Sequence, residues 1–286
     1  MTKHTKRVLF YTTVVIFLFL SYIIILYAQG YKYNFLERKF ERTGSIYLKT
    51  NVGADIYIDG EKAGSTSFLG NSHTVSGLLP GEYLVSLRRN DAYSSWEKKV
   101  DVQEGLVNEF SKIVLLPISD EAKETLEAEL ETLLYPPTLK PIPSTNASRP
   151  SATPRPTPKK TPKPTTSPTP SPITEPYYLK SSILYKNNGP DKDPDQLTVN
   201  VAGFMLSSDK NKLAYWNGRE LWVMWLEKPN YQPIKEAGDK ERVIRLSRSI
   251  VKAAWYKDED WLVVDDGKAY KVIEIDTRGG VNVVEF

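Results

Sequence analysis

The chain begins with an apolar stretch that limits where the rest of it can fold. Residues 8–29 read VLFYTTVVIFLFLSYIIILYAQ and contain no Asp, Glu, Lys or Arg. In a helix that rises 1.5 Å per residue, about 21 residues reach the roughly 30 Å of a bilayer's hydrocarbon core. A helix that is apolar on every side would otherwise have to be covered on every side by protein. We therefore expect a transmembrane helix at residues 8–29.

A cleaved secretory signal peptide is the competing interpretation, because Lys3, Lys6 and Arg7 precede the stretch. The apolar region of a signal peptide is usually only about 7–15 residues long, which favours an uncleaved anchor. Basic residues also follow the stretch, so the charge bias across it is small. Because Lys6 and Arg7 adjoin the helix, we expect residues 1–7 in the cytoplasm and the C-terminal domains outside a single-pass cell membrane.

Composition excludes several classes of chemistry. The chain has no cysteine and only two histidines, His4 and His73, which excludes disulfides, thiolate metal sites and a cysteine nucleophile. The 38 Lys and Arg against 35 Asp and Glu are too evenly balanced to favour a nucleic-acid partner. We predict no catalytic residues, no cofactor and no metal ligands, and hence a protein that is not an enzyme.

Residues 44–117 show short runs of strand-forming residues separated by turn signals, which predicts a small β-sandwich. Asp59-Gly60 is typical of a tight hairpin turn, and Pro80-Gly81 of a turn whose second central residue has a positive φ. The expected strands lie at residues 45–48, 54–58, 82–87, 96–102 and 110–116.

The segments GADIYIDGEKAGST and SGLLPGEYLVSLRR resemble the PEGA domain, a small extracytoplasmic β-sandwich. The likeness rests on the Asp59-Gly60 turn, Gly64, the segment from Gly77 to Tyr83, and a late strand that ends in Leu115. It covers about 70 residues. The resemblance implies a non-catalytic envelope module, and it brings no catalytic residues to this chain.

Two connecting segments follow the predicted sandwich. Residues 119–134 are predicted to form a short amphipathic helix, whose Ala122, Leu126, Leu130 and Leu133 we expect to pack on the sandwich. Residues 136–176 contain 14 Pro and 14 Ser or Thr, a composition that cannot form a packed core. In an extended polyproline conformation this linker would reach on the order of 120 Å, and we expect it to hold the sandwich and the next module apart.

Residues 177–286 contain an internal repeat. The segment from Leu213 to Val223 aligns with the segment from Leu262 to Val272, and each holds two β-runs around a turn, Asn217-Gly218 or Asp266-Gly267. With a strand on either side, the copies become two four-stranded units at about residues 203–246 and 250–286.

The repeat resembles blades of WD40-like and TolB-like β-propellers, through Ser208 and the run from Lys212 to Tyr215. A closed ring needs at least about four blades, so we expect a partial propeller-like domain. It would pair in an oligomer, form an open stack, or belong to a ring that is incomplete at Phe286. The predicted fold class is thus mainly β, with a transmembrane helix, a sandwich, a Pro-rich linker and a propeller-like domain.

Four aromatic residues are candidate ligand-binding positions: Tyr57, Trp96, Trp222 and Trp255. Tyr57 and Trp96 would stack on sugar rings as a pair, or else pack across strands. The predicted function is that of a membrane-anchored bacterial envelope protein, which binds peptidoglycan, another wall polysaccharide or envelope proteins through its β-domains. The alternative function is a sensory or regulatory membrane protein that detects an extracellular ligand.

Overall fold

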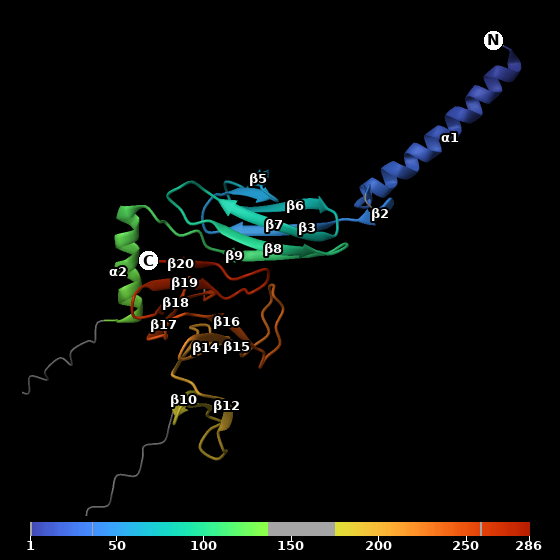
Figure 1. Cartoon of the computed structure of the whole chain (residues 1–286). Coiled ribbons are helices and arrows are strands. Elements are labelled where there is room, and N and C mark those ends of the chain that lie inside the picture. Colours follow the sequence, from blue (N-terminus) through green and yellow to red (C-terminus); the bar gives the residue numbers. More distant parts are fainter. Residues whose placement is uncertain (1, 36, 137–174, 258) are drawn as a thin grey trace, which may run out of the picture. The chain divides into compact units, whose positions relative to one another are not determined.

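A computed structural model of the chain describes residues 2–35, 37–136, 175–257 and 259–286. These residues form a mainly β protein, with two helices and many short strands in six small sheets (Figure 1). The contacts divide the chain into two compact units. One unit joins Met1–Leu134 to Ala202–Phe286, and the other is Tyr135–Val201. Residues 202–286 therefore belong with the N-terminal half of the chain.

The apolar N-terminal stretch forms helix α1, Lys3–Ala28, which has no buried residue. The side chain of Thr2 accepts a hydrogen bond from the Thr5 amide at its start. Gly30, at φ 84°, ends the helix in the left-handed conformation that glycine adopts readily. Mean hydropathy over its apolar window is 2.5, so α1 is long and apolar enough to be a single membrane span or a signal sequence.

A short hairpin that the sequence did not predict follows α1. Its strands are β1, Tyr31–Asn34, and β2, Lys39–Arg42. The two strands form a sheet of their own.

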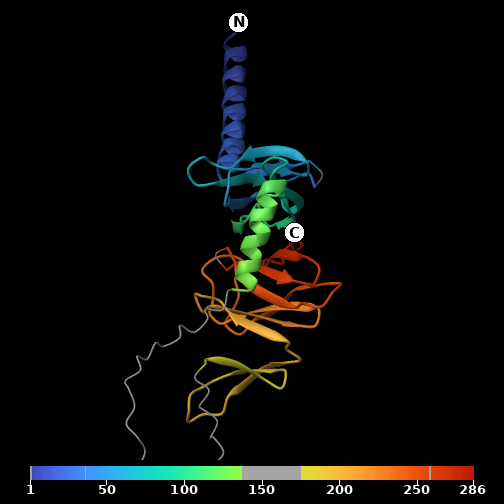
Figure 2. The same ribbon diagram turned by 90° about the vertical axis from the view of Figure 1, so that its left-hand side faces the viewer.

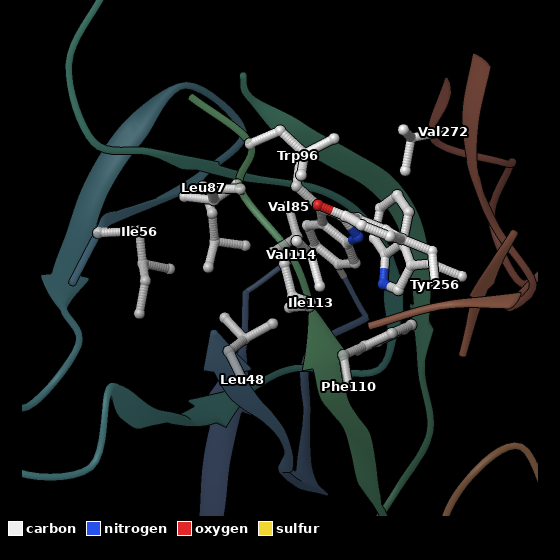
Figure 3. Close-up of a cluster of buried hydrophobic side chains, with 14 of the residues drawn as sticks. Leu48, Ile56, Val85, Leu87, Trp96, Phe110, Ile113, Val114, Tyr256 and Val272 are labelled. Atoms are coloured by element: carbon white, nitrogen blue, oxygen red, sulfur yellow. The ribbon is translucent and has the colours of Figure 1, made fainter. Parts of the chain in front are cut away.

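The next seven strands form two sheets that face each other as a sandwich. The first sheet has the order β6-β3-β9, with β3 at Gly44–Thr50, β6 at Ser72–Leu78 and β9 at Val107–Ile113. The second has the order β5-β4-β7-β8, with β4 at Asp55–Ile58, β5 at Glu61–Ser65, β7 at Gly81–Arg88 and β8 at Trp96–Val102. Leu48 from the first sheet and Ile56, Val85 and Leu87 from the second meet in one buried core (Figure 3).

The turn residues have different roles in the sandwich. Asp59 at φ 51° and Gly60 at φ 85° form the two-residue turn between β4 and β5. Pro80 and Gly81 lie where the chain crosses from β6 in one sheet to β7 in the other, and so they do not close a hairpin. The sequence did not predict β5 and β6, because these strands contain few apolar residues.

Helix α2, Asp120–Leu134, buries Leu126, Leu130 and Leu134. These leucines recur every four residues and so line one face, whereas Leu133 is exposed. The sequence predicted that this helix packs on the sandwich. The helix contacts β17, Lys252–Tyr256, and β18, Trp261–Asp265 (Figure 2).

The internal repeat forms two four-stranded antiparallel sheets, each with its strands in chain order. The first C-terminal sheet contains β13 Gly203–Leu206, β14 Lys212–Asn217, β15 Glu220–Trp225 and β16 Lys240–Arg245. The second contains β17 Lys252–Tyr256, β18 Trp261–Asp265, β19 Tyr270–Glu274 and β20 Val283–Glu285. A three-stranded sheet of the other unit contains β10 Tyr177–Lys180, β11 Ile183–Lys186 and β12 Asp195–Val199. Among the described residues none of these sheets closes on itself.

The two repeat turns differ in detail. In the first, Asn217 pairs with Glu220, so the turn is centred on Gly218 and Arg219. In the second, Asp265 pairs with Tyr270 across a longer loop. Within this loop the Asp266 carboxylate accepts hydrogen bonds from the backbone N–H groups of Lys268 and Ala269.

The sandwich and the second C-terminal sheet share one hydrophobic core. Trp96 and Phe110 of the sandwich belong to the same buried cluster as Tyr256, Trp261 and Val272 (Figure 3). This differs from the expectation of two modules held apart by the Pro-rich segment, of which residues 137–174 lie outside the described residues. A sandwich of about 70 residues buries only about 60% of its unfolded surface, and the second C-terminal sheet covers part of the remainder.

Candidate functional site

The first pair of predicted ligand-binding aromatics is not brought together. Trp96 is 1% exposed, and its Nε1 lies 3.2 Å from both carboxylate oxygens of Glu274. Tyr57 pairs with Ser86 while Trp96 pairs with Leu87, and neighbouring positions on a strand face opposite sides. Tyr57 is half-buried beneath Arg88, so the two rings cannot hold one sugar between them.

The second pair lies in two different sheets. Trp222 on β15 is half-buried, stacks on Tyr215 at 6.2 Å and donates to Glu220. Trp255 on β17 is half-buried too, and its Nε1 donates to the carbonyl of Met205 at 3.4 Å. Neighbouring side chains and backbone thus hold both rings, and the two do not form a common platform.

Trp96 instead belongs to a buried ionic cluster between the sandwich and the second C-terminal sheet, which we call the junction. Lys98 lies on β8 two residues after Trp96. Its Nζ is 3.1 Å from Glu274 Oε2 and 3.7 Å from Asp276 Oδ1. The Asn282 side-chain amide donates to Glu274 Oε2 at 2.9 Å. Burial raises the pKa of Glu274 above its ordinary value, although Lys98 and the donors oppose the shift. Breaking this cluster would leave buried charge unpaired.

The junction also covers exposed strand edges of the sandwich. On β9, the Gln232 side chain bonds to the carbonyl of Val107 and the amide of Glu109, while Arg278 bonds to the Glu109 carbonyl at 2.7 Å. On β8, the Lys99 amide donates to the Gly279 carbonyl at 3.2 Å. The unpaired N–H and C=O groups of an edge strand can pair with a strand of another chain. The hydrogen bonds above occupy such groups on β9 and on β8.

A second ionic group lies close by. Asp260 Oδ1 accepts from Tyr231 at 2.6 Å and from Lys212 at 3.0 Å, and Oδ2 lies 3.6 Å from Lys112 Nζ. Burial, followed by the charge of Asp260, raises the pKa of Tyr231 well above its ordinary value. The adjoining cavity, lined by residues that include Phe110, has a volume of about 20 Å³. It holds nothing larger than a water molecule, so the junction serves to join the sheets.

An open cleft lies at the other end of β3 from the β1–β2 hairpin, and we call it the tip cleft. Its volume is about 600 Å³, within the range of small-molecule sites. The loop between β5 and β6 forms one wall, where Phe68 is 97% exposed and Leu69 is 96% exposed. The polar side chains that line the cleft are Asn51, Asp55, Ser65, Thr66, Ser67, Asn71 and Arg89.

The walls of the tip cleft are fixed by local hydrogen bonds. The side-chain oxygen Oδ1 of Asn51 accepts from the backbone N–H of Leu115 at 2.8 Å, and its Nδ2 donates to the Leu115 carbonyl at 3.1 Å. Asn71 donates to the Asn51 carbonyl at 3.2 Å, and Arg89 donates to the Gly53 carbonyl at 3.2 Å. These bonds hold the lining before any ligand binds, which lowers the entropy cost of binding.

The tip cleft presents groups that suit a polyhydroxylated ligand. Hydrogen bonds from Ser65 and Lys62 lower the pKa of Asp55, so its carboxylate is ionised at neutral pH. Arg89 adds a permanently charged donor, and Phe68 adds an exposed aromatic face. In the part of the chain that the structure describes, no group of three His, Cys, Asp or Glu side chains could hold a metal ion.

Sequence reasoning missed Phe68 and Leu69, although a signal was present. The pair interrupts an otherwise polar run, Ser65 to Asn71, where nothing in the strand pattern requires an apolar residue. No protein-family model, no curated protein and no solved structure matches the chain.

Proposed function

We propose that this protein is a membrane-anchored envelope protein that binds glycan strands of a wall polymer in the tip cleft, without catalysing a reaction. The observation that carries the proposal is the cleft itself, because a preorganised polar lining lies beside a fully exposed Phe68. Aromatic rings pack on the apolar C–H faces of sugars, while amide, carboxylate and guanidinium groups bond their hydroxyls.

The position of the tip cleft supports an anchored role. The hairpin that follows α1 leads into β3 at Gly44, and β3 ends at Thr50 beside the cleft. At about 3.3 Å per residue, the seven residues of β3 separate these ends by roughly 23 Å. With α1 as the membrane span, the ligand site and the anchor lie at opposite ends of the sandwich. The resemblances to PEGA domains and to propeller blades favour the same role in the envelope.

Binding by the full-length chain in detergent micelles tests the proposal. We expect the chain to sediment with purified, insoluble wall polymer. Phe68→Ala should weaken binding about three- to tenfold, because the aromatic contact with a sugar is lost. Arg89→Ala should weaken it about tenfold or more, because a hydrogen bond from a charged donor is lost.

Matched variants separate the cleft from general surface effects. Leu106 is 55% exposed in the turn between β8 and β9, so Leu106→Ala removes apolar surface away from the cleft. Arg88→Ala removes a positive charge from the residue next to Arg89. Both controls should bind like the wild type. A wild-type chain that stays in the supernatant, or one that sediments equally well with Phe68 and Arg89 both replaced, overturns the proposal.

A further inference from the structure

The β1–β2 hairpin has two chemically different faces. Its register places Tyr31 opposite Arg42 and Tyr33 opposite Phe40, so aromatic side chains share one face. The other face pairs Lys32 with Glu41 and Asn34 with Lys39, and it is wholly polar. Four residues in each strand are enough to make the hairpin amphipathic.

The aromatic face is exposed. The Tyr33 ring packs edge-on against Phe35 at 5.1 Å and against Phe40 at 5.2 Å. In spite of these contacts, Phe35 is 83% exposed, Phe40 41% and Tyr33 39%. Exposing three clustered aromatic rings to water is unfavourable relative to burying them. This face would therefore be more stable in an apolar or interfacial environment.

The polar face is tied to the sandwich and to the end of α1. Lys32 Nζ donates to the Gly77 carbonyl at 2.6 Å. The amide and the hydroxyl of Thr43 both donate to the Gly30 carbonyl at 2.8 Å, which closes the hairpin back on the residue that ends α1. The hairpin therefore stays beside the helix end with its aromatic face free.

Charge distinguishes this hairpin from a plain apolar patch. It carries four basic residues, Lys32, Arg38, Lys39 and Arg42, against two acidic residues, Glu37 and Glu41. Glu41 is engaged within the hairpin by Asn34 at 2.6 Å and by Lys39 at 3.0 Å. The net positive charge complements anionic lipid headgroups, to which each basic residue near a membrane surface is attracted.

We propose that the β1–β2 hairpin lies in the headgroup region of the membrane, with Tyr33, Phe35 and Phe40 inserted. Arg42, which shares the aromatic face, and the exposed Arg38 then contact anionic lipid. The inference rests on α1 being the membrane span of the proposed function. The last helical residue, Ala28, is followed by only Gln29 and Gly30 before β1 begins. Four residues of strand reach about 13 Å, so the hairpin cannot leave the neighbourhood of the bilayer surface. Aromatic residues favour that interface.

The absence of cysteine makes a direct test simple, because each introduced cysteine carries the only label. Phe35→Cys, modified with an environment-sensitive fluorophore, is reconstituted as full-length protein into vesicles of zwitterionic and anionic phospholipid. We expect its emission to shift to shorter wavelength and to be quenched by nitroxide attached near the lipid headgroup. Phe68→Cys is the matched control, since this phenylalanine is also largely exposed but lies at the tip cleft. Its label should show neither effect.

A third label separates the anchor from the hairpin. Leu20→Cys lies within α1, and its label should be quenched by nitroxide placed deep in the acyl chains. If the Leu20 label is quenched and the Phe35 label behaves like the Phe68 label, the hairpin inference is overturned while the anchor stands. If the Leu20 label is not quenched either, both fall. Replacing Arg38 and Arg42 by Gln should reduce the quenching of the Phe35 label in anionic vesicles, and an unchanged signal would overturn the role of charge.

Discussion

The junction and the tip cleft are built from similar residues and have opposite properties. Each combines a basic residue, a carboxylate and an aromatic ring: Lys98, Glu274 and Trp96 in one, Arg89, Asp55 and Phe68 in the other. At the junction the lysine side chain is completely buried and the ring is 1% exposed. At the tip cleft the ring is almost wholly exposed.

The difference shows why residue type alone does not identify a binding site. Trp96 is the larger aromatic and the stronger candidate on sequence, yet its ring and its Nε1 are already occupied by protein partners. Phe68 has no such cover. A binding site needs exposed groups that are held in place, whereas a joint between sheets needs groups whose partners come from the other sheet.

The strongest test of the junction is to remove its cation. Lys98→Ala would remove the buried cation beside Glu274, whereas Asp276 would keep its pairing with Arg278. We expect the free energy of unfolding to fall by about 3–5 kcal/mol. Urea unfolding of the full chain in micelles, followed by tryptophan fluorescence, measures this change.

The neighbouring lysine provides the matched control. Lys99 pairs with Glu82 at the surface, where both side chains are about two-thirds exposed. Lys99→Ala should therefore change stability by no more than about 1 kcal/mol. Equal losses for the two lysines would contradict the structural role given to the junction.

Close approach of the backbone at the junction gives a second test. A Cβ on Gly279 would lie 1.9 Å from the Lys99 carbonyl oxygen, and φ there is +62°. Gly280, at φ +112°, has open space around the same position. Gly280→Ala should cost about 1–2 kcal/mol through backbone strain, and Gly279→Ala about 1–3 kcal/mol more through overlap. If the two variants unfold at the same urea concentration, the contact between β8 and residue 279 is not made as described.

Much of the local structure could be predicted from sequence. Alternating apolar residues predicted β4 and Asp59-Gly60 predicted the turn that follows it, and the repeat predicted the strands of both C-terminal sheets. These features depend on neighbours within a few residues. The β1–β2 hairpin was not predicted because its strands have only four residues each, although aromatic and polar residues alternate along β1.

The junction could not be predicted in the same way, since Trp96 and Glu274 lie 178 residues apart in sequence. One local signal was nevertheless present. β8 reads WEKKVDV with alternating burial, so Lys98 shares the inner face with Trp96 and Val100. A lysine on the buried face of a strand requires an anionic partner from elsewhere, although the sequence does not say which residue supplies it.

The smallest expected effect is a difference in pH dependence between the two carboxylates. Burial raises the pKa of Glu274, so its contribution to stability is greatest below the unfolded value of about 4.3 and falls as pH rises through the folded pKa. Hydrogen bonds from Ser65 and Lys62 lower the pKa of Asp55, so its contribution is present above about 3.9 and is lost as pH falls through the folded pKa.

The isosteric variants Glu274→Gln and Asp55→Asn test these opposite pH dependences of stability. The stability of wild type relative to Glu274→Gln should fall as pH increases from about 4, because only the wild type titrates. The stability of wild type relative to Asp55→Asn should rise by a few tenths of a kcal/mol over the acid range and then stay constant, since solvent screens this exposed pair. Urea unfolding of the wild type and the two variants between pH 3 and pH 8 measures these differences. Curves of the same sign for both variants would mean that Glu274 and Asp55 occupy similar environments, and the distinction between a closed junction and an open cleft would fail.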